Sequence, residues 1–167
     1  YSDAHGPWTP VQFAAGPNGT TRLLWINYGI RATPSLAGTR ALKSSEGAKI
    51  VPVSIGSEAS IWSFDQNGVA ATKGPAYGPY ADGDTAWTPI QLAVAPDGTS
   101  RLMWTEGYPT AVSFWTLSSA GVETHTGSIY GPYLNWRPMN FDIDSAEGTL
   151  RLLWVNDSQS DNFGDEI

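Results

Sequence analysis

The chain repeats itself, and this repetition constrains its fold more than any other feature. One segment runs from Trp-x-Pro to Arg-Leu-x-Trp and occurs at residues 8–25, 87–104 and 136–154. A second segment runs from Ser-x-Trp to Tyr-Gly-Pro-Tyr and occurs at residues 60–80 and 113–133. All eight tryptophans stand at repeated positions. A fold for this chain must therefore be built from copies of one unit.

The spacing of the copies gives the length of that unit. Trp8 lies 79 residues before Trp87, whereas Trp62 lies only 53 residues before Trp115. The difference indicates a 26-residue insertion in the first copy, near residues 30–56. Without the insertion the unit is about 50 residues long, which is within the range of a four-stranded propeller blade.

Short apolar runs between glycine- and proline-rich turns predict an all-β fold of antiparallel strands. We expect one repeat domain over residues 1–167, with two four-stranded units at about 1–80 and 81–133. A partial unit at about 134–156 and an acidic tail at 157–167 follow. The expected strands are residues 10–15, 20–27, 60–65, 69–77, 89–95, 100–106, 111–118, 122–130, 139–144 and 150–156. The insertion is either a surface excursion or a functional loop, since loops of this length are uncommon in compact domains.

The motifs Tyr-Gly-Pro-Tyr, Trp-Thr-Pro, Arg-Leu-Leu-Trp and Ser-x-Trp resemble those of tandem-repeat bacterial and lectin-type β-propellers, of the tachylectin and Psathyrella lectin kind. The resemblance covers nearly all of the chain outside the insertion and the tail. It implies two and a half blades, sugar binding between blades and a location outside the cell or at its surface. Because so few blades cannot close a ring, it also implies either a homo-oligomer, in which two copies supply five blades, or further blades of a longer chain.

Composition narrows the range of partners. The net charge is −7 and the isoelectric point is near 4.6, which disfavours nucleic acid and anionic membrane surfaces as partners. No run of eighteen apolar residues is present, so we expect no membrane span. The absence of cysteine excludes disulfides and thiolate metal sites.

Aromatic residues recur where a loop meets the first strand of each unit. Trp and Tyr offer flat apolar rings with a polar edge, on which sugar rings can stack. Polar neighbours would supply hydrogen bonds to sugar hydroxyls. The predicted carbohydrate site therefore comprises Trp8, Trp87, Trp136, Tyr80, Tyr133, Asp82 and Asn135, with Tyr1 and Asp3 as the counterparts in the first unit.

Two other interpretations of the repeated residues remain open. The loop-to-strand aromatics can instead pack between chains, in which case the protein is a structural, adhesion or self-assembly module without a small ligand. The tryptophans within strands, Trp25, Trp62, Trp104, Trp115 and Trp154, are expected to pack between units. Arg22, Arg101 and Arg151 are expected to bridge neighbouring carboxylates or carbonyls, with a ligand role as the alternative.

The sequence gives little sign of catalysis. The two histidines, His5 and His125, are not repeated, and no Gly-x-Ser-x-Gly motif is present. Paired carboxylates such as Asp82 and Asp84 could in principle act as a glycosidase pair, but they lie in a glycine-rich loop. We therefore predict a protein that is not an enzyme and has no cofactor. Solvated acidic loops, rather than calcium sites, are expected at Asp142, Asp144 and Glu147 and at Asp157, Asp161 and Asp165.

Overall fold

The computed structural model describes residues 8–28, 56–82, 85–107, 110–144 and 146–156. Within these ranges the chain is all-β, with one 3-10 turn at Pro17–Gly19. None of the described helical structure is long and apolar enough to cross a membrane. The insertion at 30–56, apart from Gly56, and the acidic tail lie outside the described residues.

The strands form three antiparallel sheets, which we call units 1, 2 and 3. Unit 1 contains β1 (Thr9–Ala15), β2 (Thr21–Asn27), β3 (Glu58–Phe64) and β4 (Ala70–Tyr77), in that order across the sheet. Unit 2 contains β5 (Ala81–Asp82), β6 (Thr85–Val94), β7 (Ser100–Glu106), β8 (Ala111–Leu117) and β9 (Glu123–Tyr130), also in chain order. Unit 3 is the hairpin of β10 (Trp136–Ile143) and β11 (Leu150–Asn156). All ten predicted strands are present, with shifted ends, and β5 is an additional short strand that was not predicted. Leaving β5 aside, the first strand of each unit is β1, β6 or β10 and the second is β2, β7 or β11.

The first strand of every unit bends at the same place. Pairing with the second strand shifts register after Pro10, Pro89 and Pro138. Proline has no N–H group to donate to the neighbouring strand, so the hydrogen-bonding pattern is already interrupted there. A bulge at this position therefore costs little additional pairing. The three first strands therefore share one geometry.

The turn between β1 and β2 is made by Asn18 and Gly19. Asn18 has φ +57° and Gly19 has φ +72°, which places both residues in the left-handed region. Asparagine and glycine are the residues that adopt this conformation at least cost. The pair therefore fixes the sharp connection between β1 and β2.

Each sheet has two different faces because side chains alternate along a strand. We call the side that carries Trp25, Trp104 or Trp154 the Trp face of its unit. The opposite side, which carries Leu24, Met103 or Leu153, is the aliphatic face. Along β7 the apolar residues do not alternate with polar ones because unit 2 is covered on both faces. The strand β2 shows the same pattern, although no described unit covers the Trp face of unit 1.

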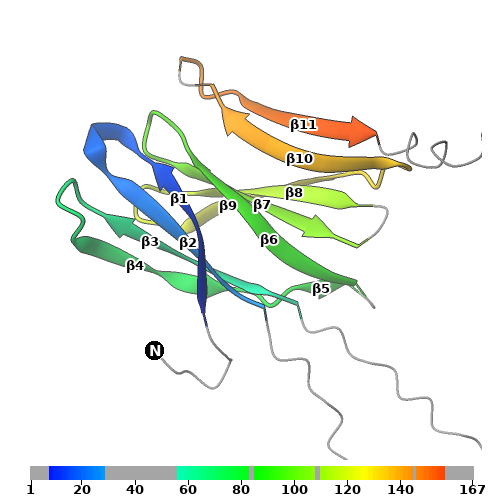
Figure 1. Cartoon of the computed structure of the whole chain (residues 1–167), viewed down its shortest axis with the longest axis horizontal. Coiled ribbons are helices and arrows are strands. Elements are labelled where there is room, and N and C mark those ends of the chain that lie inside the picture. The colour runs from blue at the N-terminus through cyan, green and yellow to red at the C-terminus, as the bar shows by residue number, and fades with distance from the viewer. Residues whose placement is uncertain (1–7, 29–55, 83–84, 108–109, 145, 157–167) are drawn as a thin grey trace, which may run out of the picture.

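The units stack in order, with unit 2 between the other two (Figure 1). The aliphatic face of unit 1 packs on the Trp face of unit 2, in a core that contains Leu24, Ile61 and Trp104. The aliphatic face of unit 2 packs in turn on the Trp face of unit 3, where Phe114 meets Phe141. The ring centroids of these two phenylalanines are 5.1 Å apart. One kind of contact therefore occurs twice.

The repeated tryptophans of the second strands are not equally buried. Trp104 is 1% exposed, as predicted, but Trp25 and Trp154 are only half-buried. The repeat predicts equivalent, buried positions for these three tryptophans, and this prediction is wrong for Trp25 and Trp154 because burial depends on what covers the Trp face. No described unit lies on the Trp face of unit 1, and the described part of unit 3 has two strands rather than four.

Arg22 joins unit 1 to unit 2. It is 5% exposed, and its guanidinium donates to Ser100 Oγ and Gly98 O as well as to Ser119 O at 3.0 Å. Burial lowers the pKa of Arg22, and the negative charge of Asp97 partly offsets this effect. The predicted structural role of Arg22 as a bridge to carbonyl groups is confirmed.

Two glutamines make a second kind of link between units. The Gln12 side chain bonds to both backbone groups of Leu92, accepting from its N–H at 2.7 Å and donating to its C=O at 3.0 Å. Gln91 does the same to Phe141, at 3.2 Å and 2.8 Å. Each glutamine thus holds the first strand of its own unit against the first strand of the next one.

Candidate functional site

Units 1 and 2 carry equivalent cavities on their Trp faces. The unit 1 cavity has a volume of about 560 Å³ and the unit 2 cavity about 230 Å³. Every residue that lines the first has its repeat counterpart in the lining of the second, which also includes Tyr80. The first lining is Trp8, Trp25, Ser60, Trp62, Lys73, Gly74 and Ala76, and the second is Trp87, Trp104, Ser113, Trp115, Thr126, Gly127 and Ile129 with Tyr80. We call these the Trp cavities.

The tryptophan rings have the same mutual geometry in both Trp cavities. The ring centroids of Trp25 and Trp62 are 5.0 Å apart at 45°, and those of Trp104 and Trp115 are 5.1 Å apart at 42°. Cross-strand pairing fixes this arrangement, because one ring comes from the second strand and one from the third. In unit 2, Tyr80 lies 4.8 Å from Trp115 and closes one side.

A hydroxyl group also recurs in the lining. Ser60 Oγ donates to Gly74 O at 3.1 Å, and Ser113 Oγ donates to Gly127 O at 3.2 Å. The donor of each hydroxyl is therefore used, while its oxygen keeps lone pairs that can accept. Each cavity thus combines aromatic surface with a fixed hydroxyl group.

The indole N–H groups of Trp25 and Trp104 are buried and have no hydrogen-bond partner among the described residues. Buried tryptophans usually find an acceptor for this group. The same donor is therefore left unpaired at the same repeat position in both Trp cavities.

The two Trp cavities differ in charge. In unit 1 the ammonium group of Lys73 lies 4.6 Å from the centre of the Trp62 ring, within the range of a cation–π contact. Its repeat counterpart in unit 2 is Thr126, which is neutral. The unit 1 cavity is therefore larger and cationic, and the unit 2 cavity is smaller and neutral.

A third cavity, of about 400 Å³, lies between units 2 and 3. Its lining combines Phe114 and Tyr130 of unit 2 with Tyr133 and Trp154 at unit 3. The rings of Tyr133 and Trp154 meet edge to face, with centroids 5.1 Å apart at 75°. This cavity repeats only the Tyr–Trp part of the unit 2 arrangement.

The structure brings together some of the predicted site residues but not all. Trp8 and Trp87 are half-buried and line the two Trp cavities, and Tyr80 lines the same cavity as Trp87. Tyr133 lines the third cavity instead. The side chain of Asp82, together with Tyr1 and Asp3, lies outside the described residues.

Trp136 and Asn135 occupy a different setting from their counterparts. Trp136 is 43% exposed, Asn135 is exposed with φ +63°, and neither belongs to the lining of the third cavity. The described part of unit 3 contributes no third and fourth strand, so the ring of Trp136 has no wall of the kind that Trp62 and Trp115 provide. Sequence reasoning missed Ser60, Ser113 and Lys73, although the 53-residue offset marked the two serines as equivalent.

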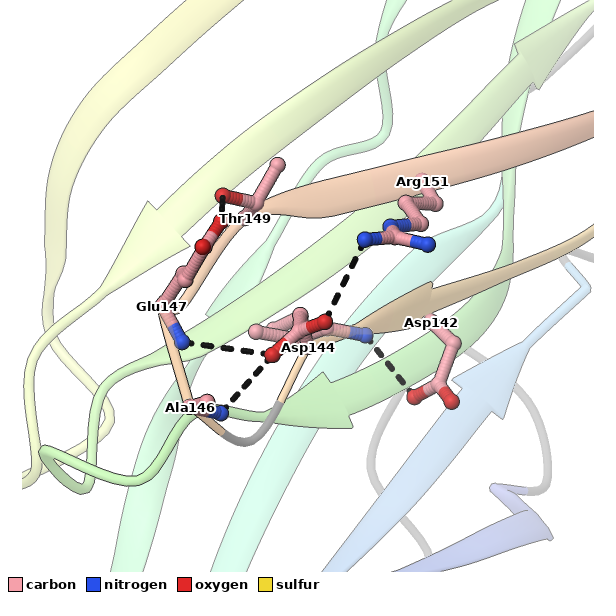
Figure 2. A network of polar contacts seen from close by, with 7 residues as sticks. Asp142, Asp144, Ala146, Glu147, Thr149 and Arg151 are labelled. Carbon is pink, nitrogen blue, oxygen red and sulfur yellow. Dashed lines mark hydrogen bonds and ion pairs between the residues drawn. The ribbon is translucent and has the colours of Figure 1, made fainter.

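The acidic loop of unit 3 is held together by its own hydrogen bonds (Figure 2). The Asp144 carboxylate accepts from the N–H groups of Ala146 and Glu147, at 2.8 and 3.2 Å, and lies 3.3 Å from the Arg151 guanidinium. Asp142 accepts from the backbone of the next residue, Ile143. Within the described ranges, no group of three or more side chains is placed to hold a metal ion. The acidic residues of the tail lie outside those ranges.

Acid should weaken the fold through the turn carboxylates. Hydrogen bonds to their ionised forms lower the pKa values: Val69 N–H for Asp65, the Thr99 hydroxyl for Asp97, and Ala146 N–H for Asp144. A group with a lowered pKa stabilises the fold above its unfolded-state pKa of about 4, and this contribution disappears as the pH falls through the folded-state value. We expect the melting temperature to fall below about pH 4.

The matched variant for this prediction replaces all three turn aspartates with asparagine, which keeps an acceptor oxygen but does not titrate. Thermal melts from acidic to neutral pH should give a flatter profile for the variant than for the wild type. Identical profiles would show that these carboxylates do not contribute to acid sensitivity.

The fold and the cavities define an all-β repeat protein with an equivalent aromatic cavity in each complete unit. Comparison of the chain with protein-family models, curated proteins and solved structures found no match. The assignment of function therefore depends on the chain's own repeats and on the geometry of the cavities.

Proposed function

We propose that this protein is a non-catalytic carbohydrate-binding module whose units are blades of a β-propeller-like assembly. The observation that carries the proposal is the recurrence of one cavity lining, position for position, in units 1 and 2, with the tryptophans, the serine and the glycine unchanged. A purely structural cavity has no need to keep an indole pair, a serine hydroxyl and a loop-to-strand tryptophan together. A binding site does, because each supplies a different part of recognition.

The chemistry of the lining suits a neutral sugar. Apolar C–H faces of a pyranose ring stack on Trp and Tyr rings, whose negative faces attract the slightly positive hydrogens. The oxygen of Ser113 can accept a hydrogen bond from a sugar hydroxyl, and the hydroxyl of Thr126 can donate or accept one. Ligand pockets commonly measure about 300–1,000 Å³. The unit 1 cavity, at about 560 Å³, is in this range and the unit 2 cavity is somewhat smaller.

Binding at each site should be weak and should gain strength from repetition. A millimolar to micromolar dissociation constant corresponds to about 4–8 kcal/mol. Sites on successive units can engage one multivalent glycan, which raises the apparent affinity without new contacts. The proposed setting is extracellular or on a cell surface, where such glycans are displayed.

The test is a glycan array followed by titration of single variants. Replacing Trp87 with alanine should weaken binding at the unit 2 cavity by about tenfold or more, a loss of about 1.4 kcal/mol or more. Replacing Trp136, which has the same repeat position but lines none of the described cavities, is the matched control and should change binding little. Moderate salt should also have little effect, because stacking is not screened.

The second variant, Ser113→Ala, guards against loss of folding, since it removes one hydroxyl from the lining and no aromatic surface. Circular dichroism would confirm that each variant is folded. The proposal fails if the array shows no glycan, or if folded proteins lacking both Trp8 and Trp87 bind as the wild type does. An assembly module without a small ligand would then be the better explanation of the aromatic cavities.

A further inference from the structure

The two outer faces of the stack are the two halves of a contact that the chain already makes twice. Inside the chain, an aliphatic face packs on the Trp face of the following unit. At the ends of the described stack, the Trp face of unit 1 and the aliphatic face of unit 3 have no described unit against them (Figure 1). These two outer faces are therefore of the same two kinds that pack against each other inside the chain.

Exposed side chains on the Trp face of unit 1 show what is uncovered there. Phe13 is 67% exposed, whereas its repeat counterparts Leu92 and Phe141 are 1% and 3% exposed. Those two residues are covered by the preceding unit. A large aromatic ring left in water at a position that is otherwise buried marks a surface that can accept a partner.

The aliphatic face of unit 3 shows the same pattern. Leu153 is 57% exposed, although its counterparts Leu24 and Met103 are fully buried. In the two internal contacts, this position is covered by the following unit. Unit 3 thus carries in Leu153 the side chain that packs against the following unit in the two internal contacts, but no described unit lies against it.

The polar part of the contact is also repeated. Arg151 is the counterpart of Arg22 and has a 74% exposed side chain. On unit 1, Thr21 and Gly19 occupy the positions of the hydroxyl and carbonyl acceptors that Arg22 reaches on unit 2. Gly19 has the same left-handed backbone as its counterpart, with φ of +72° against +83°. The two outer faces therefore carry an arginine and the counterparts of its acceptors. Arg151 bonds to Asp144 within its own hairpin, and in the proposed contact its guanidinium would turn to these acceptors instead.

We propose that a second copy of this chain places the aliphatic face of its unit 3 on the Trp face of unit 1. The chain itself carries both complementary surfaces, so no other partner has to be assumed. Such a head-to-tail contact uses different surfaces on the two copies and forms a ring where the rotation closes. The two strands of unit 3 would cover β1 and β2, leaving Trp62 and Lys73 on β3 and β4 accessible. The proposal shares the blade arrangement with the proposed function but does not depend on sugar binding.

Sedimentation velocity without any glycan tests the proposal directly. We expect a mass at least twice the 17.9 kDa of one chain. Leu153→Asp and Phe13→Asp should each shift the protein to monomer, because a charge replaces an apolar contact. Val69→Asp is the matched control, since Val69 is 61% exposed but lies at the β3–β4 turn, outside the proposed contact. A monomeric wild type, or dissociation by Val69→Asp as well, would overturn the proposal.

Cross-linking then tests the register of the contact. The chain contains no cysteine, so single cysteines can be introduced without background. A short bismaleimide should join Thr21→Cys on one copy to Arg151→Cys on another when the two variants are mixed. The mixture of Val69→Cys with Arg151→Cys should give no product. A product from the Val69→Cys and Arg151→Cys mixture, with none from the Thr21→Cys and Arg151→Cys mixture, would show that the copies meet through other surfaces. A failure to bind glycan would not affect this proposal.

Discussion

Replacing Trp104 with alanine is expected to lower the free energy of unfolding by about 3–5 kcal/mol. The side chain is 1% exposed and lies in the core between units 1 and 2. Its ring centroid is 5.1 Å from that of Trp115 and 5.3 Å from that of Tyr80. Truncation would remove both ring contacts and leave a cavity that the surrounding sheets cannot fully close. Urea unfolding monitored by circular dichroism provides the measurement.

Two comparisons separate this effect from a general intolerance of substitution. Trp25→Ala removes the same side chain at the same repeat position, but the ring is only half-buried, so the loss should be smaller. Trp104→Phe should be milder than the alanine variant, because the indole N–H that it removes has no described partner. The comparison is made in the Leu153→Asp background, which is expected to be monomeric, so that no second copy covers Trp25. Equal losses for Trp25→Ala and Trp104→Ala in that background would contradict the stacking of unit 1 on unit 2.

Replacing Arg22 with alanine should cost about 2–4 kcal/mol, as expected for the loss of charge-assisted bonds from a buried site. Its three acceptors all belong to unit 2, so the variant breaks a link between units rather than within one. Arg22→Lys should recover only part of the loss, because an ammonium group cannot reproduce the planar fork of donors. Equilibrium unfolding of the three proteins in urea checks this.

Arg101→Ala is the matched control for that measurement. Arg101 stands at the same repeat position, but it donates to Thr99 Oγ1 and Ser100 O of its own hairpin, at 3.1 and 3.3 Å. We expect a loss of about 1 kcal/mol. If Arg101→Ala were as damaging as Arg22→Ala, the importance of Arg22 could not be attributed to its bonds with unit 2.

The sequence predicted the strands and their order well, because a repeat shows the period of the fold directly. The glycine- and proline-rich segments also predicted where the strands turn. The register shifts after Pro10, Pro89 and Pro138 were not predicted, although the three prolines recur at one repeat position. These features are local, so each unit carries the information for its own sheet.

Burial and partner choice could not be predicted in the same way, because they depend on neighbouring units. Arg22, Arg101 and Arg151 occupy the same position in the repeat, yet each bonds to a different kind of partner. Arg22 bonds to the next unit, Arg101 to its own hairpin and Arg151 to a nearby carboxylate. Likewise, Trp136 matches Trp87 in the repeat but lacks the cavity wall. The repeat pattern predicts the strands of each unit, whereas the burial and bonding of each residue depend on how the units stack.

The glutamine links have a consequence for how such a chain can change. Gln12 and Gln91 bind the backbone N–H and C=O of the neighbouring strand, not its side chain. The neighbouring residue is leucine in one case and phenylalanine in the other, and each donates one bond through its N–H and accepts one through its C=O. The side chains on the surface of a unit can therefore change without loss of this attachment. For the same reason a whole unit could be duplicated, deleted or exchanged for another copy, because the new neighbour would offer the same backbone groups.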